Sequence, residues 1–150
     1  MEYIENESGF DKKSGISIVA LKHLGEKFVG FAKVHPDDKD RASQFAGCTY
    51  AESRAYIKAM KYERRKAKEE AEICRKFIKA CSCYKNWDPE SPTAKAAYRQ
   101  LNRRIKKVND LTEIINDEMF RLSQTIWRRD ITLKAFEKNK QNRLSDNSEN

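Results

Sequence analysis

The sequence predicts an α+β fold, in which an N-terminal antiparallel β-hairpin or small sheet precedes a long antiparallel two-helix coiled-coil hairpin. Two observations predict it. Residues 16–34 alternate in polarity around a glycine-containing turn, and residues 49–138 carry apolar side chains at spacings of three and four. We expect one domain over residues 1–150, divided into a flexible arm (1–15), the β-hairpin and connection (16–48), the helical hairpin (49–138) and a disordered tail (139–150).

The predicted β-hairpin has two partly apolar faces. Ile16, Ile18 and Ala20 share one face of the first strand, and the alternate residues Ser17, Val19, Leu21 and His23 share the other. Gly25-Glu26-Lys27 is the expected turn. Gly30 inside the return strand indicates a bulge or a close approach by another group. Because an isolated hairpin is marginally stable, we expect a third strand or a neighbouring chain beside it.

The first predicted helix begins at a capping box, Thr49-Tyr50-Ala51-Glu52, and runs to about Tyr84. Arg64 interrupts an otherwise small or apolar seam, so it must pair with a carboxylate, reach solvent or face an anion. The expected seam consists of Ile57, Met60, Arg64, Ala67, Ala71, Cys74, Ile78 and Cys81.

The second predicted helix runs from Ser91 to about Lys138. Ser91 is its expected N-cap, and Pro92 suits the first helical position because the missing N–H has no partner there. Thr112 and Arg129 interrupt its heptad seam. The remaining seam positions are Ala94, Tyr98, Leu101, Ile105, Val108, Ile115, Met119, Leu122, Ile126, Leu133 and Phe136. So long a seam in so short a chain predicts a homo-oligomer, a dimer or higher.

Positive charge is concentrated in the helical part. The chain has a formal net charge of +8, and residues 49–138 hold 22 Lys or Arg against 13 Asp or Glu, a net of +9. Such a field favours a polyanion or a phosphorylated ligand as partner. A solvated helical surface in a slightly basic protein is the alternative.

The sequence predicts a non-enzymatic protein without a cofactor. It contains no Gly-rich phosphate loop, no His-Glu-x-x-His helix and no Gly-x-Ser-x-Gly elbow. His35-Pro36-Asp37-Asp38 is interpreted as a turn rather than a catalytic site. Cys48, Cys74, Cys81 and Cys83 lack zinc-site spacing and are expected to be small buried thiols. The polar N-terminus and the lack of a long apolar run predict a cytosolic protein that does not enter a membrane.

Two segments resemble a recurrent type of small phage-encoded protein. They are Val29-Gly30-Phe31-Ala32-Lys33-Val34-His35-Pro36-Asp37-Asp38 and Glu52-Ser53-Arg54-Ala55-Tyr56-Ile57-Lys58. The order of elements is also similar to that of the phage anti-Thoeris cyclic-nucleotide sponge proteins. This resemblance implies an oligomer in the host-cell cytosol that sequesters cyclic ADP-ribose-type immune signals, with a pocket between subunits lined by Arg and aromatic residues.

Local chemistry, rather than that resemblance, suggests the ligand-binding residues. The guanidinium group of Arg can donate two parallel hydrogen bonds to phosphate oxygens, and aromatic rings stack on bases. The candidates are Arg54, Arg64, Trp87, Tyr98, Arg103, Arg121, Arg128 and Arg129. The first functional hypothesis is therefore sequestration of a small phosphorylated nucleotide. The alternatives are a nucleic-acid-binding or anti-CRISPR-type inhibitor, and a structural coiled-coil assembly protein.

Overall fold

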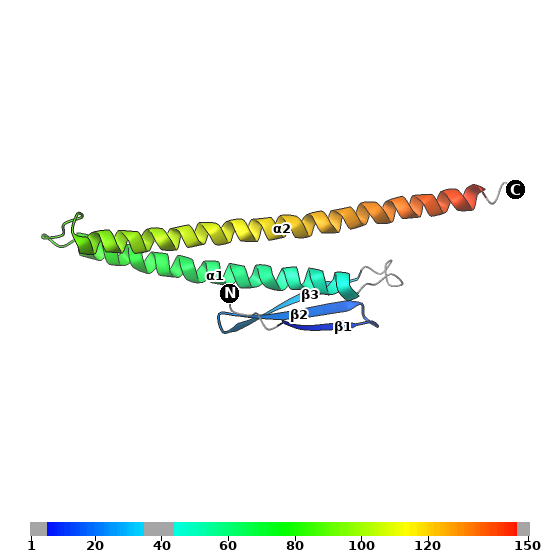
Figure 1. Ribbon diagram of the computed structural model, residues 1–150, viewed down its shortest axis with the longest axis horizontal. Helices are drawn as coiled ribbons and strands as arrows, with labels where there is room; N and C mark the ends of the chain where they lie inside the picture. The colour runs from blue at the N-terminus through cyan, green and yellow to red at the C-terminus, as the bar shows by residue number, and fades with distance from the viewer. Residues whose placement is uncertain (1–5, 35–43, 147–150) are drawn as a thin grey trace. The chain divides into compact units, whose positions relative to one another are not determined.

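The computed structural model describes residues 6–34 and 44–146 and confirms the α+β class (Figure 1). The described elements are β1 (Asn6–Asp11), β2 (Ile16–His23), β3 (Glu26–Lys33), α1 (Gln44–Ser82) and α2 (Pro92–Asp146). Contacts group the chain into two compact units, residues 1–116 and 117–150. The first holds the sheet, α1 and the start of α2, and the second holds the rest of α2. Each is described by itself.

The sheet of the first unit is antiparallel, with strands in the order β1-β2-β3. β1 supplies the third strand that the hairpin needed, and it lies in the segment that we expected to be a flexible arm. That expectation was wrong for residues 6–11, because their pairing with β2 satisfies the backbone despite a polar sequence. The turn between β2 and β3 uses Leu24 and Gly25, which have φ values of 51° and 79°. Positive φ at both central residues matches the twist of a two-residue hairpin.

α1 lies against the face of the sheet that carries Ser17, Val19 and Leu21, a choice that the two partly apolar faces left open. Ala51 and Ala55 are fully buried in this contact. Gly30 is the point of closest approach, since a β-carbon there would overlap the carbonyl oxygen of Ala51 and lie 2.7 Å from the nitrogen of Ala55. The glycine in the strand therefore marks a close approach by the helix.

α1 begins at Gln44, more than one turn before the predicted capping box. Thr49 lies inside the helix, where its hydroxyl donates to the carbonyl oxygen of Phe45 at 2.9 Å. The capping-box prediction was wrong because Gly47 and Ala51 pack on the sheet, and tertiary packing outweighs the local signal. His35-Pro36-Asp37-Asp38 lies outside the described residues.

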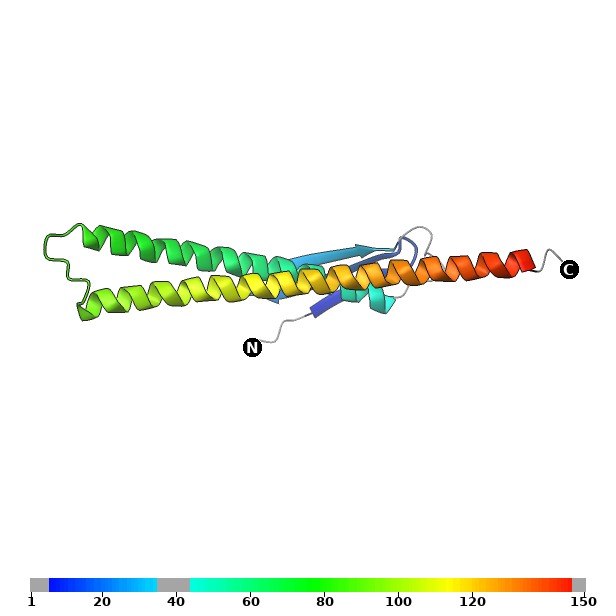
Figure 2. The same ribbon diagram turned by 90° about the horizontal axis from the view of Figure 1, so that it is seen from above.

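Within the first unit, α1 and residues 92–116 of α2 run antiparallel and side by side (Figures 1 and 2). Ser91 caps α2 as predicted, accepting a hydrogen bond from the Ala94 nitrogen at 3.2 Å. The predicted seam of α1 is buried or half-buried throughout.

The seam of α2 is rotated from the predicted one in this unit. Leu111, which the heptad pattern omitted, is 6% exposed, whereas the expected seam residue Tyr98 is 41% exposed. Ala94 and Ile115 are buried as expected. α2 therefore turns a slightly different side toward α1 and leaves part of its apolar stripe uncovered.

The second unit consists of the last part of α2. The helix runs to Asp146, so the expected tail is helical over residues 139–146. High helix propensity among its Lys, Gln, Arg and Leu residues accounts for the extension. Met119 and Phe120 are exposed in this unit.

Candidate anion-binding surface on α1

One side of α1 carries a row of basic side chains, which we call the cationic flank. Its members follow one another at steps of four, three, seven, one and three residues, which keeps them on one side of the helix. The row extends over about 27 Å at 1.5 Å per residue. It consists of Lys61, Arg65, Lys68, Arg75, Lys76 and Lys79, all exposed.

Most charges of the cationic flank are not neutralised. Within the described residues, Lys61, Lys68, Lys76 and Lys79 form no ion pair. Arg65 lies 3.9 Å from Glu69, and Arg75 lies 3.6 Å from Glu72, both within α1 and exposed. Pairs of this kind contribute little and are screened by salt. The flank therefore presents net positive charge to solvent.

The acidic side chains Glu63 and Glu70 of α1 point elsewhere and are bound to other elements. Glu70 pairs with Arg104 of α2 at 2.8 Å, and Glu63 pairs with Lys107 at 2.7 Å. Glu63 also lies 2.8 Å from His23 Nε2 of β2. Burial opposes ionisation of Glu63, but hydrogen bonds from Lys107 and His23 outweigh it and hold its pKa below the ordinary value. These carboxylates neutralise basic residues away from the flank.

A groove borders the cationic flank where α1 meets α2, with a volume of about 650 Å³. Ala71 of α1 and the half-buried Ile105 and Val108 of α2 give it an apolar lining. The flank residues Lys68, Arg75 and Lys76 line it as well, together with Glu69, Glu72, Ile73 and Asn109. An apolar lining beside cations suits a ligand that combines flat or apolar groups with phosphates.

Tyr98 does not line the groove, but it lies on the same helix, α2. It precedes Ile105 by one heptad and so lies on the same side of α2 as the groove. Its partly exposed ring is available for stacking. Arg103 is exposed five residues later, and that step turns it to another side of the helix.

Arg64 and Arg54 have partners inside the protein. Arg64 donates to the hydroxyl oxygen of Thr112 at 3.4 Å, so the polar interruptions of the two seams meet each other. Arg54 donates to the carbonyl oxygen of Phe31, and Lys58 donates to that of Val29 at 2.6 Å. Both contacts satisfy edge-strand carbonyls of β3, which makes a structural role sufficient for Arg54.

Trp87 lies in the connection between the helices. Its backbone nitrogen donates to the Tyr84 carbonyl oxygen at 3.0 Å, and its side chain is half-buried. It therefore stabilises a turn at the end of the helical hairpin. Its ligand-binding role stays a prediction.

The other predicted arginines belong to the second unit. Arg121 pairs with Glu118 at 3.0 Å, and a hollow of about 420 Å³ is lined by Arg121 and Arg128 with Asp117, Phe120, Gln124 and Thr125. The side chain of Arg129 lies outside the described residues. The structure thus brings Arg121 and Arg128 together but assembles no single pocket from the predicted set within either unit's described residues.

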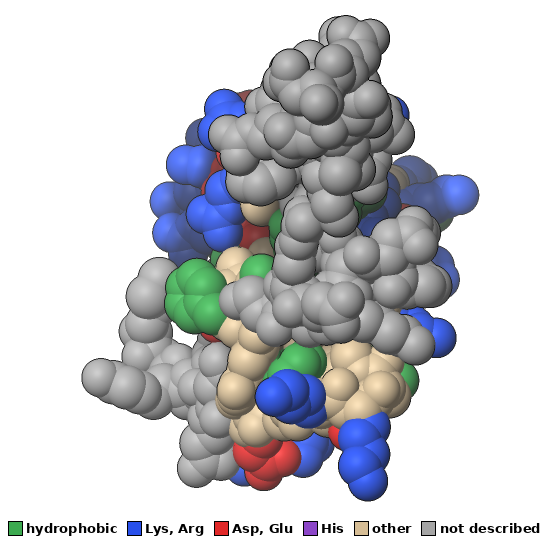
Figure 3. All heavy atoms as spheres, turned by 90° about the vertical axis from the view of Figure 1, so that its right-hand side faces the viewer, with side chains coloured by type: hydrophobic (Ala, Val, Ile, Leu, Met, Phe, Trp, Pro, Cys, Tyr) green, Lys and Arg blue, Asp and Glu red, His purple; other side chains and the backbone are tan. Residues whose placement is uncertain are grey.

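The predicted set of ligand-binding residues does not include Lys61, Lys68, Lys76 and Lys79. Their regular spacing was a usable signal, because the same periodicity was applied to the apolar residues. The spacing does not show which of the interspersed carboxylates form ion pairs with basic residues of other elements. In the space-filling view of Figure 3, Lys and Arg side chains project outward on two opposite sides of the view.

The four cysteines are free thiols, but they are less buried than expected: Cys48, Cys74 and Cys81 are half-buried, and Cys83 is exposed because it lies just after the end of α1. Among the described residues, no group of three or more His, Cys, Asp or Glu side chains is placed to hold a metal ion. Nor does any helix in the described ranges combine the length and apolar content needed to cross a membrane.

No protein-family model, curated protein or solved structure matches the chain.

Proposed function

We propose that this protein is a non-enzymatic nucleic-acid-binding protein that holds a single strand along the cationic flank of α1. Phosphates lie against Lys61, Lys68 and Lys79, and bases enter the groove beside Ile105 and Val108. The exposed ring of Tyr98 offers a stacking platform farther along the same side.

The segregation of charge on α1 carries this proposal. Acidic residues are interspersed among the basic ones of α1, and of these only Glu69 and Glu72 pair with flank arginines within the described residues, in exposed contacts. Glu63 and Glu70 are instead engaged by Lys107 and Arg104, away from the flank. A linear row of about 27 Å suits an extended polyanion better than a compact ligand.

Salt dependence and substitution of the flank lysines test the proposal. We expect a fluorescent single-stranded DNA or RNA to bind the full chain in anisotropy titrations, with affinity falling steeply as salt rises. The triple variant Lys61→Gln, Lys68→Gln, Lys79→Gln should weaken binding on the order of 10- to 100-fold and reduce the salt slope by roughly 2 to 3.

The matched control is Lys12→Gln, Lys13→Gln, Lys106→Gln, which removes the same charge from exposed positions off the flank. It should retain most of the affinity. Equal losses of affinity in both triple variants would show that only the net charge of the protein matters, and not the flank. Absent or salt-independent binding by the unmodified chain would refute the proposal.

Sequestration of a compact phosphorylated nucleotide is the second candidate. The volume of the groove favours it, since about 650 Å³ lies in the usual range for small-molecule sites. The resemblance to phage sponge proteins suggests the details of this candidate function. The ligand would be an immune signal of the cyclic ADP-ribose type, and the protein would act in phage counter-defence as an oligomer in the host-cell cytosol. Incubation with cyclic ADP-ribose isomers and cyclic oligonucleotides, followed by heating, should then release an intact nucleotide. Strand binding without such release favours the first candidate.

A further inference from the structure

The face of the sheet turned away from α1, which we call the outer face, has an apolar centre that the described residues leave exposed. Ile18 on β2 is 41% exposed and Phe31 beside it on β3 is 51% exposed. The neighbouring Ile16 and Val29 are half-buried. Two large exposed side chains at the centre of a sheet face indicate a surface with a partner.

Opposite charges border this apolar centre on its two sides. The edge strand β1 contributes Glu7 and Asp11 to the outer face, and the edge strand β3 contributes Lys27 and Lys33. Asp11 and Lys33 both pair with Ile16, so they stand in one row on either side of it. The outer face is therefore acidic along β1 and basic along β3, with the apolar centre between them and the exposed Lys22 of β2 at the end next to the hairpin turn.

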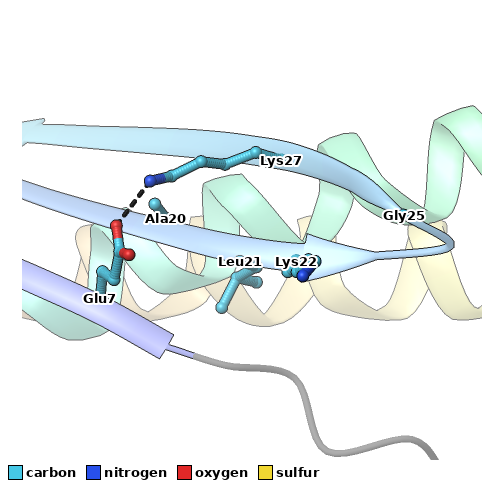
Figure 4. Close-up of a pocket in the computed structure, with 6 residues that line it drawn as sticks. All are labelled: Glu7, Ala20, Leu21, Lys22, Gly25 and Lys27. Atoms are coloured by element: carbon cyan, nitrogen blue, oxygen red, sulfur yellow. Dashed lines mark hydrogen bonds and ion pairs between the residues drawn. The ribbon is translucent and has the colours of Figure 1, made fainter.

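The acidic edge is ionised at neutral pH. The Ser14 hydroxyl and the Lys13 backbone N–H donate to the Asp11 carboxylate and hold its pKa below the ordinary value. Lys27 does the same for Glu7, and the 2.5 Å ion pair between them crosses β2 over Ala20 (Figure 4). Lys33 forms no ion pair within the described residues.

We propose that the outer face binds a second copy of this chain, sheet against sheet, about a two-fold axis parallel to β2. This rotation places β2 over its own counterpart, so that Ile18 meets Ile18 of the other copy. It places the acidic β1 over the basic β3 of the other copy, with Asp11 facing Lys33. The row of Asp11 and Lys33 is self-complementary under that axis, and Lys22 lies over its own counterpart at the end of the sheet, beyond the apolar centre.

The perpendicular two-fold axis in the same plane gives the opposite result. It places β1 over β1 and β3 over β3, so that carboxylates face carboxylates and ammonium groups face ammonium groups. Like charges in an interface are repulsive, so this arrangement is less favourable than one that pairs Asp11 with Lys33. The charge pattern thus selects the partner and also its orientation.

Light scattering and sedimentation of the full chain test the interface. We expect a dimer at micromolar concentration, and Ile18→Arg should raise its dissociation constant roughly 100-fold or more, because the residue lies at the centre of a symmetric contact. Lys33→Glu should weaken it less, by placing two carboxylates together. The control Ile73→Arg changes an equally apolar side chain that is 67% exposed on α1 and should leave the mass unchanged.

Cross-linking tests the axis. In a variant with all four cysteines replaced by serine, Ile18→Cys should cross-link to itself through a short bifunctional maleimide, since packed sheets lie about 10 Å apart. Phe31→Cys should not, but a mixture of Phe31→Cys with Gly9→Cys should. A monomeric wild-type chain, a folded Ile18→Arg dimer, or self-cross-linking of Phe31→Cys in preference to Ile18→Cys would overturn the proposal. Thermal melting of each variant establishes that it is folded.

Discussion

α1 packs against two neighbours in the first unit, and the two contacts are built differently. Toward the sheet it presents Gly47, Ala51 and Ala55, and the approach is so close that Gly30 has no room for a β-carbon. Toward α2 it presents Ala67, Ala71 and Ile78, joined by ion pairs such as Glu70–Arg104.

The contact of α1 with the sheet therefore has a fixed geometry, whereas its contact with α2 can adjust. The contact with the sheet depends on steric fit between backbones, where fractions of an ångström matter. The contact with α2 combines apolar side chains with charged ones that have rotamer freedom, and it borders a groove of about 650 Å³. We expect substitutions in the first contact to cost more than comparable ones in the second.

Gly30→Ala should have the largest effect. Its β-carbon meets backbone atoms of Ala51 and Ala55, which cannot move without displacing the helix. We expect a loss of about 3 kcal/mol or more in the free energy of unfolding, measured by urea titration. Gly9→Ala is the control, because a β-carbon there has nothing within 4 Å. Similar losses in both variants would contradict the close contact.

Gly47→Ala should cost less, about 1 to 3 kcal/mol, because its β-carbon overlaps a side-chain atom, the Ser17 hydroxyl oxygen. That hydroxyl is buried without a hydrogen-bond partner among the described residues. Ser17→Ala should therefore be neutral or slightly stabilising, and it should recover most of the loss when combined with Gly47→Ala. The remaining contact, with the Ser17 β-carbon, is 3.1 Å. A double variant with additive effects would refute this contact.

Glu63→Gln should cost about 2 kcal/mol at neutral pH, because it weakens charged hydrogen bonds to Lys107 of α2 and His23 of β2. The folded-state pKa of Glu63 lies below its unfolded value of about 4.3, so the carboxylate stabilises the fold above that pH. This contribution disappears as the pH falls from about 4 through the folded-state pKa. The difference between wild type and variant should therefore shrink in urea titrations at acid pH.

Glu70→Gln is the matched control for Glu63→Gln. The Glu70–Arg104 pair is half exposed, and such pairs contribute about 0 to 1 kcal/mol. High salt should reduce even this small effect. A cost for Glu70→Gln equal to that of Glu63→Gln would show that burial does not distinguish the two carboxylates.

Much of the fold could be predicted because local patterns specify it. Strand alternation grouped Ser17, Val19 and Leu21 on one face without deciding which face α1 covers, and the seam of α1 was predicted residue by residue. Ser91 and Pro92 fixed the start of α2. β1 and the first turn of α1 could not be predicted, because their residues carry weak local signals and are held by pairing and packing with distant parts of the chain.

The candidate site was less predictable. Choosing Arg and aromatic residues by type identified Tyr98, which shares a side of α2 with the groove-lining Ile105, but also Arg54 and Arg64, whose hydrogen bonds go to Phe31 and Thr112. The flank lysines were missed because a charge in sequence says nothing about its neutralisation across an interface.

The sequence by itself determined the elements, since hydrophobic periodicity and capping act over a few residues. Tertiary structure decided which side of each element is covered. It rotated the seam of α2 toward Leu111, set Gly30 against α1, and engaged Glu63 and Glu70 on one side of α1 while Lys61 and Lys68 stayed exposed on the other. These outcomes depend on distances between residues far apart in the chain, and local periodicity carries no information about such distances.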